Sequence, residues 1–171
     1  MKTILINTVL IIALSTVSIA QKFAFVDTEY ILKNIPSYAT AQDKLDQISV
    51  EWQKEIEAYY SEIDKMYKDF QAEKVLLTEE MKIKREDAII AKEKEVKELQ
   101  KKYFGQEGEL YKKRQELVKP IQDDVFNAVK DIATEGGYAA IFDTSNGANM
   151  LFTDPKFDRS DEVLKKLGYK N

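Results

Sequence analysis

A stretch of 41 residues without glycine or proline, residues 38–78, most constrains the fold of this chain. Its apolar side chains recur at alternating steps of three and four residues, with two successive steps of four around Trp52, which is typical of a coiled-coil helix with one stutter. They are Tyr38, Ala41, Leu45, Ile48, Trp52, Ile56, Tyr59, Ile63, Met66 and Phe70. At a rise of 1.5 Å per residue the helix is about 60 Å long, so it must extend beyond a compact body.

A second helix of matching length is predicted over residues 79–119. Thr78 is followed by two glutamates, which favours a helix start and a fold-back at this point. Apolar residues then recur every seven positions, while the companion positions are mostly polar. The repeat is Ile89, Val96, Tyr103, Leu110 and Leu117, and its companions are Lys92, Leu99, Gln106 and Lys113. The two helices are therefore expected to pair as an antiparallel hairpin that buries little apolar surface per turn.

Two glycines, Gly105 and Gly108, interrupt the second helix. Trp52 and Gly105 are about equally far from the turn, so antiparallel pairing places them opposite each other. One interpretation is that the glycines make room for the indole. The other is that they form a hinge, because a glycine inside a helix costs about 1 kcal/mol relative to alanine.

The N-terminal part of the mature chain is predicted to contain one strand and one short helix. Residues 22–27 alternate like a strand. Thr28 can cap a helix over residues 29–34, which Pro36 is expected to end. Ser37 is then placed to cap the long helix.

The C-terminal part is predicted to contain two helices and a β-hairpin. Pro120 fits the first turn of a helix that a glycine pair ends. Residues 138–143 and 149–153 read as strands joined by a turn at Ser145-Asn146-Gly147. Ser160 is placed to cap a last helix, Asp161 to Leu167, which Gly168 is expected to stop.

The resulting fold class is α+β and mainly α, with a long, coiled-coil-like antiparallel helical hairpin projecting from a small body that contains β-strands. The hairpin arm comprises residues 38–119. The body comprises residues 21–37 and 120–171.

Composition excludes most catalytic and cofactor chemistry. The chain has no His and no Cys, so it lacks a serine triad, a thiol nucleophile and a thiolate or imidazole zinc site. No nucleotide-binding motif occurs, and we predict no enzyme activity, cofactor, metal site or catalytic residue. A formal charge of −4 argues against nucleic-acid binding. Four aspartates that could suggest an enzyme or a carbohydrate-binding module fit turn and cap positions: Asp143, Asp154, Asp158 and Asp161.

Residues 1–20 read as a signal peptide. Lys2 precedes an apolar run, and small residues lead to Ala20, after which cleavage is expected. Polar residues interrupt the run, which favours cleavage over a membrane anchor. No Cys follows, so a lipoprotein is excluded.

Four large side chains lie off the stripe of the first helix: Tyr60, Tyr67, Leu76 and Leu77. Exposed apolar groups along a charged rod can make weak contacts with an unfolded chain. They can equally pack on the partner helix or on a neighbouring subunit, and both interpretations stay open.

The order of strand, short helix, two long helices, helix, hairpin and last helix after a signal peptide resembles the Skp/OmpH family of periplasmic chaperones. Phe23-Ala24-Phe25-Val26-Asp27-Thr28 with Ile31-Leu32 is similar to the first strand and helix of that family. The segment from Tyr138 to Leu167 is similar to its C-terminal part. The resemblance covers the whole mature chain.

The resemblance implies a periplasmic homotrimer whose arms enclose a cavity that holds unfolded outer-membrane β-barrel proteins without ATP. The residues expected to form the trimer core are Phe23, Phe25, Ile141, Phe142, Leu151 and Phe152. The best-known members are strongly basic, whereas this chain has a pI near 5.1. A lipopolysaccharide or membrane contact is therefore not carried over. The alternative function is a structural coiled-coil spacer of the cell envelope.

Overall fold

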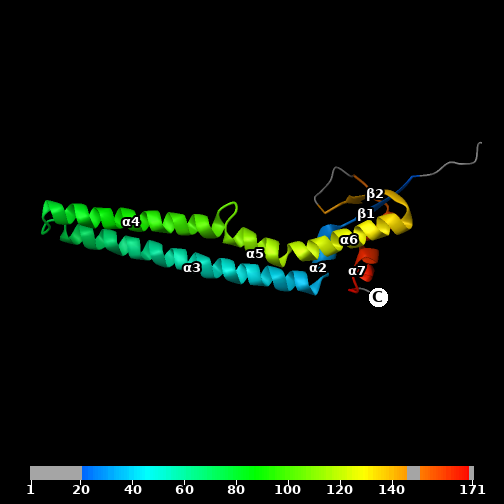
Figure 1. The fold of residues 1–171 in the computed structure, drawn as a ribbon, viewed down its shortest axis with the longest axis horizontal. Helices are drawn as coiled ribbons and strands as arrows, with labels where there is room; N and C mark the ends of the chain where they lie inside the picture. Colours follow the sequence, from blue (N-terminus) through cyan, green and yellow to red (C-terminus); the bar gives the residue numbers. More distant parts are fainter. Residues whose placement is uncertain (1–20, 146–150, 170–171) are drawn as a thin grey trace, which may run out of the picture. The chain divides into compact units, whose positions relative to one another are not determined.

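The computed structural model describes residues 21–145 and 151–169. Contacts divide it into a helical unit, Leu32–Asp124, and a second unit made of the described residues before and after it. Figure 1 shows the elements, which are β1 (Lys22–Val26), α2 (Thr28–Lys33), α3 (Pro36–Glu73), α4 (Glu79–Phe104), α5 (Glu109–Leu117), α6 (Lys119–Gly136), β2 (Tyr138–Asp143), the 3-10 helix η1 (Pro155–Phe157) and α7 (Ser160–Lys166).

The helical unit is built on a hairpin in which α3 and α4 lie side by side (Figure 1). All ten residues of the predicted α3 stripe are buried or half-buried, so the predicted periodicity is confirmed. The core between the two helices consists of Ile56, Ile63, Phe70, Ile89 and Val96. A second cluster joins the start of α3 to α5 and the residues that follow it, with Ala41, Leu45 and Val118 at its centre.

The turn of the hairpin lies where the sequence predicts it. Helix α3 ends at Glu73 and α4 begins at Glu79. The Thr78 side chain accepts a hydrogen bond from the Met81 backbone N–H at 3.3 Å, which is the expected cap.

The second arm of the hairpin is not the single helix predicted over residues 79–119. Helix α4 ends at Phe104, Gly105 and Gly108 cap the two helix ends, and α5 begins at Glu109. The backbone conformation at both glycines is extended. The seven-residue repeat hides this break because it continues in phase from Tyr103 to Leu110.

Two predicted helix caps, Thr28 and Ser37, are wrong in detail. Asp27, one residue before Thr28, accepts the Tyr30 backbone N–H at 2.9 Å and so caps α2. The short helix α2 ends at Lys33, ahead of Pro36 as predicted, and Pro36 itself begins α3, because proline fits a first helical turn. Ile35 stands at the α3 N-cap without a side-chain cap, so Ser37 does not fill that role.

The sheet has two parallel strands in the described residues, not the predicted three. Strand β1 pairs with β2, with Ala24 opposite Ile141 and Phe25 opposite Phe142. The other edge of β1 is covered by a bridge from Phe25 to Asp158 and by the Arg159 N–H, which donates to the Phe25 carbonyl at 2.8 Å.

The predicted returning strand is wrong where it can be checked. Residues 151–153 are not in a strand, and the remainder of that segment and residues 146–147 of the predicted turn lie outside the described residues. The C-terminal segment reaches β1 through residues 158–159 instead.

Ser160 connects elements instead of capping α7. Its hydroxyl accepts a hydrogen bond from the Asp27 N–H at 2.8 Å and donates one to Asp158 at 2.6 Å, while Asp158 also accepts one from the Ser160 N–H at 2.8 Å.

The predicted glycine stops are confirmed, since Gly137 and Gly168 follow α6 and α7 with positive φ angles of 64° and 83°. The fold is α+β and mainly α with a long helical hairpin, as predicted.

Candidate functional site

One flank of the helical hairpin carries two of the predicted binding residues. Tyr60 and Tyr67 stand one heptad apart on α3 and are 47 % and 42 % exposed. The Tyr67 hydroxyl donates to Glu93 on α4 at 3.1 Å. This hydrogen bond and the nearby negative charge raise the pKa of Tyr67, so the phenol stays neutral and the ring remains an apolar surface with an anchored hydroxyl.

The other two predicted binding residues, at the turn of the hairpin, have different environments. Leu76 is 86 % exposed, and Val75 beside it is also exposed. Leu77 is half-buried against the core cluster that contains Phe70. The structure thus presents Leu76 on the surface, whereas Leu77 packs against the core between the two helices.

The sequence reasoning missed three exposed apolar residues on α4. Ile83 and Ile90 are each 58 % exposed, and Met81 is also exposed. The signal that could have found the isoleucines is their seven-residue spacing outside the stripe of Ile89 and Val96.

The opposite flank of the hairpin is polar. Lys92 forms ion pairs with Glu62 at 3.0 Å and Glu95 at 3.3 Å, and its ammonium lies 4.3 Å from the centre of the Tyr59 ring. The hydrogen bond to Glu62 contributes most to raising the pKa of Lys92. Lys92 occupies a position of the predicted helix stripe. Its ion pairs with two glutamates and its contact with the Tyr59 ring fix it between the two helices.

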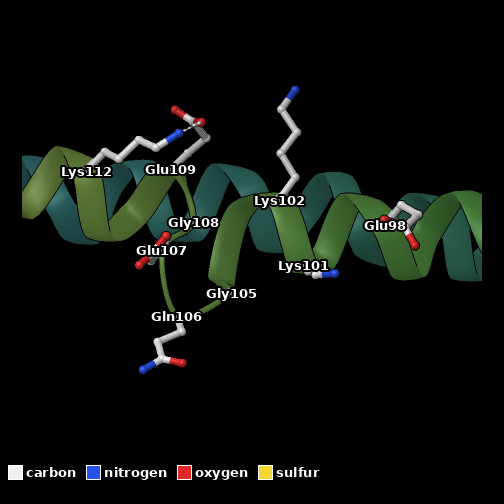
Figure 2. Close-up of a pocket in the computed structure, with 9 residues that line it drawn as sticks. All are labelled: Glu98, Lys101, Lys102, Gly105, Gln106, Glu107, Gly108, Glu109 and Lys112. Atoms are coloured by element: carbon white, nitrogen blue, oxygen red, sulfur yellow. Dashed lines mark hydrogen bonds and ion pairs between the residues drawn. The ribbon is translucent and has the colours of Figure 1, made fainter.

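Figure 2 shows the break between α4 and α5, where a loop replaces the helical ladder over Gly105, Gln106, Glu107 and Gly108. A Cβ atom on Gly105 would collide with the Lys101 carbonyl oxygen of the preceding turn. A Cβ atom on Gly108 would lie 2.8 Å from the Tyr103 carbonyl oxygen. The glycines therefore permit a close backbone approach.

The aromatic residues beside the break form their own contact. The indole of Trp52 stacks on Tyr103 at 4.5 Å and meets Phe104 edge-on at 6.3 Å. The nearest neighbours of a Cβ built on either glycine belong to residues 101–105 of the same arm, and that the glycines make room for the indole stays a prediction.

The second unit exposes an aromatic sheet face. The rings of Phe23 and Phe25 lie 6.2 and 6.0 Å from that of Phe142, and Phe23 and Phe142 are nearly half exposed. Because side chains alternate across a strand, Ile141 lies on the opposite face. Of the predicted trimer-core residues outside the strands, Leu151 and Phe152 are exposed.

A cavity of about 540 Å³ adjoins this sheet face and is lined by Gln21, Lys22, Phe23, Phe25, Tyr138, Phe157 and Arg159. Arg159 donates to the Tyr138 hydroxyl at 2.7 Å, which fixes the polar end of the cavity. The remainder is largely aromatic.

The four aspartates have structural roles. Asp143 accepts hydrogen bonds from the Thr28 hydroxyl at 2.7 Å and from the Ser145 N–H at 3.0 Å. Asp154 caps η1, Asp158 binds Ser160, and Asp161 accepts from the Tyr30 hydroxyl. Within residues 21–145 and 151–169, no cluster of acidic residues is arranged to hold a metal ion, and no helix there is long and apolar enough to span a membrane.

Comparison with known proteins gives the chain a family. The sequence model of the family described as outer membrane protein (OmpH-like) matches residues 22–167. An uncharacterized protein of Aquifex aeolicus (strain VF5) is 31 % identical over 155 residues, which cover 88 % of each chain. A crystal structure of a candidate OmpH-like outer membrane chaperone from Caulobacter crescentus CB15 has a similar fold, with a TM-score of 0.67, 12 % identity and coverage of 86 % of this chain and 83 % of that one. The chain therefore belongs to the OmpH-like outer membrane protein family.

Proposed function

We propose that the chain is an ATP-independent periplasmic holdase chaperone, exported by a signal peptide cleaved after Ala20. It binds unfolded outer-membrane β-barrel proteins in a cavity between the arms of a homotrimer and prevents their aggregation. Membership of the OmpH-like family and the solved relative described as a candidate outer membrane chaperone support this class of function.

One structural observation carries the proposal. The hairpin exposes large apolar side chains, including Tyr60, Tyr67 and Leu76, along helices that are otherwise highly charged. Dispersed apolar contacts favour weak binding of many unfolded chains, whereas charged groups between them keep the free protein soluble. The break at Gly105 and Gly108 supports arms that bend, and a bending arm suits a cage better than it suits a rigid envelope spacer.

The aromatic sheet face supports the trimer. Phe23, Phe25 and Phe142 lie on one face of a sheet that has two strands in the part of the chain that the structure describes, and sheets of this size need further packing to be stable. In the proposed trimer, residues 21–37 and 120–171 form the body and residues 38–119 form each arm. Leu151 and Phe152 add apolar surface for the neighbouring copies.

The function is tested by diluting a urea-unfolded β-barrel protein into buffer that contains the mature chain without nucleotide. We expect light scattering to fall in proportion to added protein and to reach a minimum near one trimer per client. Scattering that stays as high as with serum albumin at equal mass would contradict the holdase. Sedimentation of the same sample reports the oligomeric state separately.

A further inference from the structure

We propose that Gln21, as the first residue of the exported chain, is a modification site at which the chain end closes to a pyroglutamyl ring. The inference rests on one part of the proposed function, namely export with cleavage after Ala20. It adds a covalent change that holding unfolded clients does not require, so the two proposals can fail separately.

A glutamine reacts in this way only when its own α-amine is a chain end. The neutral amine attacks the side-chain amide carbon Cδ, the bond from the α-nitrogen to Cδ forms, and the bond from Cδ to Nε2 breaks. One proton passes from the amine to the departing nitrogen, which leaves as ammonia, so no oxidant, reductant or further reactant is consumed. The product is a five-membered lactam, and both reacting groups belong to one residue, which gives the step the advantage of an intramolecular reaction.

The residue type at position 21 decides whether this ring closure is possible. Asparagine is one methylene shorter and would have to close a strained four-membered ring. Glutamate carries an ionised carboxylate, which is a poor electrophile and has no amide nitrogen to release. Gln21 follows directly on the small residues that lead to Ala20, so the expected cleavage places the one suitable residue type at the chain end.

The structure leaves Gln21 outside the sheet. The residue is exposed, and the pairing of β1 with β2 starts at Lys22, opposite Tyr138. Ring closure requires rotation about the backbone and side-chain bonds of Gln21, and this rotation breaks no pairing between the strands.

Charge around Gln21 favours the reactive form of the amine. Gln21 lines the aromatic cavity together with two bases, Lys22 and Arg159, and no acid is among the described residues that line it. Glu162 pairs with Arg159 at 3.5 Å and offsets part of its charge. Lys22 donates instead to the neutral Gly136 carbonyl at 3.3 Å. Nearby positive charge disfavours an ammonium group, and only the uncharged amine can attack.

Ring closure matters for the fold because the expected chain end lies directly before β1. An aminopeptidase, which removes residues one at a time from a free α-amine, would remove Gln21 and Lys22 and then Phe23. The ring of Phe23 lies 6.2 Å from that of Phe142 in the aromatic sheet face. Chain ends open locally more readily than a core, so folding alone protects this strand incompletely. A lactam has no free α-amine, and the closed ring therefore protects β1 from trimming.

The first test is mass spectrometry of the exported chain, purified from the cells that naturally produce it. Cleavage after glutamate gives the N-terminal peptide 21–29, which we expect to be lighter than its sequence mass by one ammonia molecule. An isotope-labelled synthetic peptide of the same sequence, with a free glutamine at its start, is added before digestion and measures ring closure caused by handling. A peptide of full mass, or closure no greater than in the labelled peptide, would overturn the proposal.

The same measurement separates this inference from the holdase function. If the N-terminal peptide begins at another residue, Gln21 is not a chain end and the modification fails, whatever light scattering shows. If peptide 21–29 has its full mass, cleavage after Ala20 stands and the modification fails. Suppressed scattering with an unmodified Gln21 supports the chaperone alone, whereas a modified Gln21 without suppressed scattering supports the modification alone.

The second test uses Gln21→Asn, which keeps an amide at the chain end but cannot close a five-membered ring. Gln106→Asn, the same exchange at an exposed position of the helical unit, is the matched control. The exported chains are treated with an aminopeptidase, and the loss of N-terminal residues is followed by mass. We expect Gln21→Asn to lose residues and both the parent and Gln106→Asn to lose none. Equal loss from the parent and Gln21→Asn would overturn ring closure, and equal resistance would overturn its protective role.

Discussion

The indole of Trp52 stacks almost parallel on the ring of Tyr103, with ring centres 4.5 Å apart and planes 4° apart. This contact joins α3 to the last turn of α4 immediately before the helical break, and the Tyr103 hydroxyl donates to Glu55 at 2.8 Å. The stack is therefore the last contact between α3 and α4 before the break that follows Phe104, where the second arm loses its helical hydrogen bonds.

We expect Trp52→Ala to reduce the free energy of unfolding by about 1–3 kcal/mol, because it removes a half-buried aromatic contact and its apolar area. Thermal unfolding followed by circular dichroism measures the loss. Gln53→Ala, a substitution at the exposed neighbouring position, serves as the control. A Trp52→Ala protein as stable as this control would show that the stack contributes nothing.

The break itself gives a second prediction. In Gly108→Ala the new Cβ would lie 2.8 Å from the Tyr103 carbonyl oxygen and 2.9 Å from the Gly105 nitrogen, so the loop has to move. We expect faster amide hydrogen exchange at the first turn of α5 than in the parent chain. Gln106→Ala, in the same loop, should leave exchange unchanged, and equal protection in Gly108→Ala and the parent would contradict the close-approach argument.

The sequence predicts those parts of the fold in which apolar residues recur at a regular spacing, and it predicts single breaks and pairing partners poorly. Burial on α3 follows from the spacing of residues such as Ile56 and Ile63, because a helix returns each to the same face. The break between α4 and α5 does not disturb that spacing, so only its glycines signal it. The parallel pairing of β2 with β1 was not predicted, because alternation in β2 is the same whichever strand it pairs with and in whichever direction.

The candidate site was predictable only in part, because the sequence does not show which residues outside the stripe stay exposed after the helices pair. Tyr60 and Tyr67 stand out as aromatic residues off the stripe, but Ile83 and Ile90 look like ordinary members of an apolar helix face. Which off-stripe residues stay exposed depends on how the two helices pair. The caps show the same limit, since Asp27 and Thr28 are both good capping residues and only the geometry selects Asp27.

Lys92 provides the third prediction. Because its ammonium is placed between Glu62, Glu95 and the Tyr59 ring, Lys92→Ala leaves two carboxylates near each other without the cation. We expect a lower melting temperature for Lys92→Ala than for Lys92→Met, which keeps the apolar stem that covers Tyr59.

The control for this prediction is Lys94→Ala, at an exposed position of the same helix. The difference between Lys92→Ala and Lys94→Ala should shrink in 1 M salt, because salt screens the repulsion between the carboxylates. If Lys92→Ala and Lys94→Ala have the same melting temperature at low salt, Lys92 has no role in pairing the helices.

The fourth prediction concerns acid. Partial burial acts to raise the pKa of Asp143, but hydrogen bonds from the Ser145 and Thr28 N–H groups and hydroxyls outweigh it, so the pKa of this carboxyl is lowered in the folded chain. A lowered folded pKa contributes stability above the unfolded pKa of about 3.9, and this stability is lost as pH falls through the folded pKa.

We therefore expect Asp143→Asn to lower the melting temperature at pH 6 and the difference from the parent to narrow below about pH 4. Asp46→Asn, at an exposed position of α3, is the matched control. A difference that stays constant from pH 6 to pH 3 would mean that the ionised carboxylate is not what stabilises the junction of β1, α2 and β2.

The last prediction tests the trimer through the aromatic sheet face. Phe142 contacts both Phe23 and Phe25 yet remains 45 % exposed, so a neighbouring copy that covers this face gains most from its ring. Burying a fully exposed phenylalanine side chain contributes about 1.5–3 kcal/mol. About half of that remains to be gained at Phe142, which corresponds to about a three- to tenfold change in association per subunit. In sedimentation velocity at micromolar concentration, Phe142→Ser should shift the protein from trimer to monomer, whereas Val50→Ser, on α3, should not. If Phe142→Ser sediments as the parent does, the aromatic face is not the contact between copies; if the parent itself is monomeric, the cage of three arms does not exist.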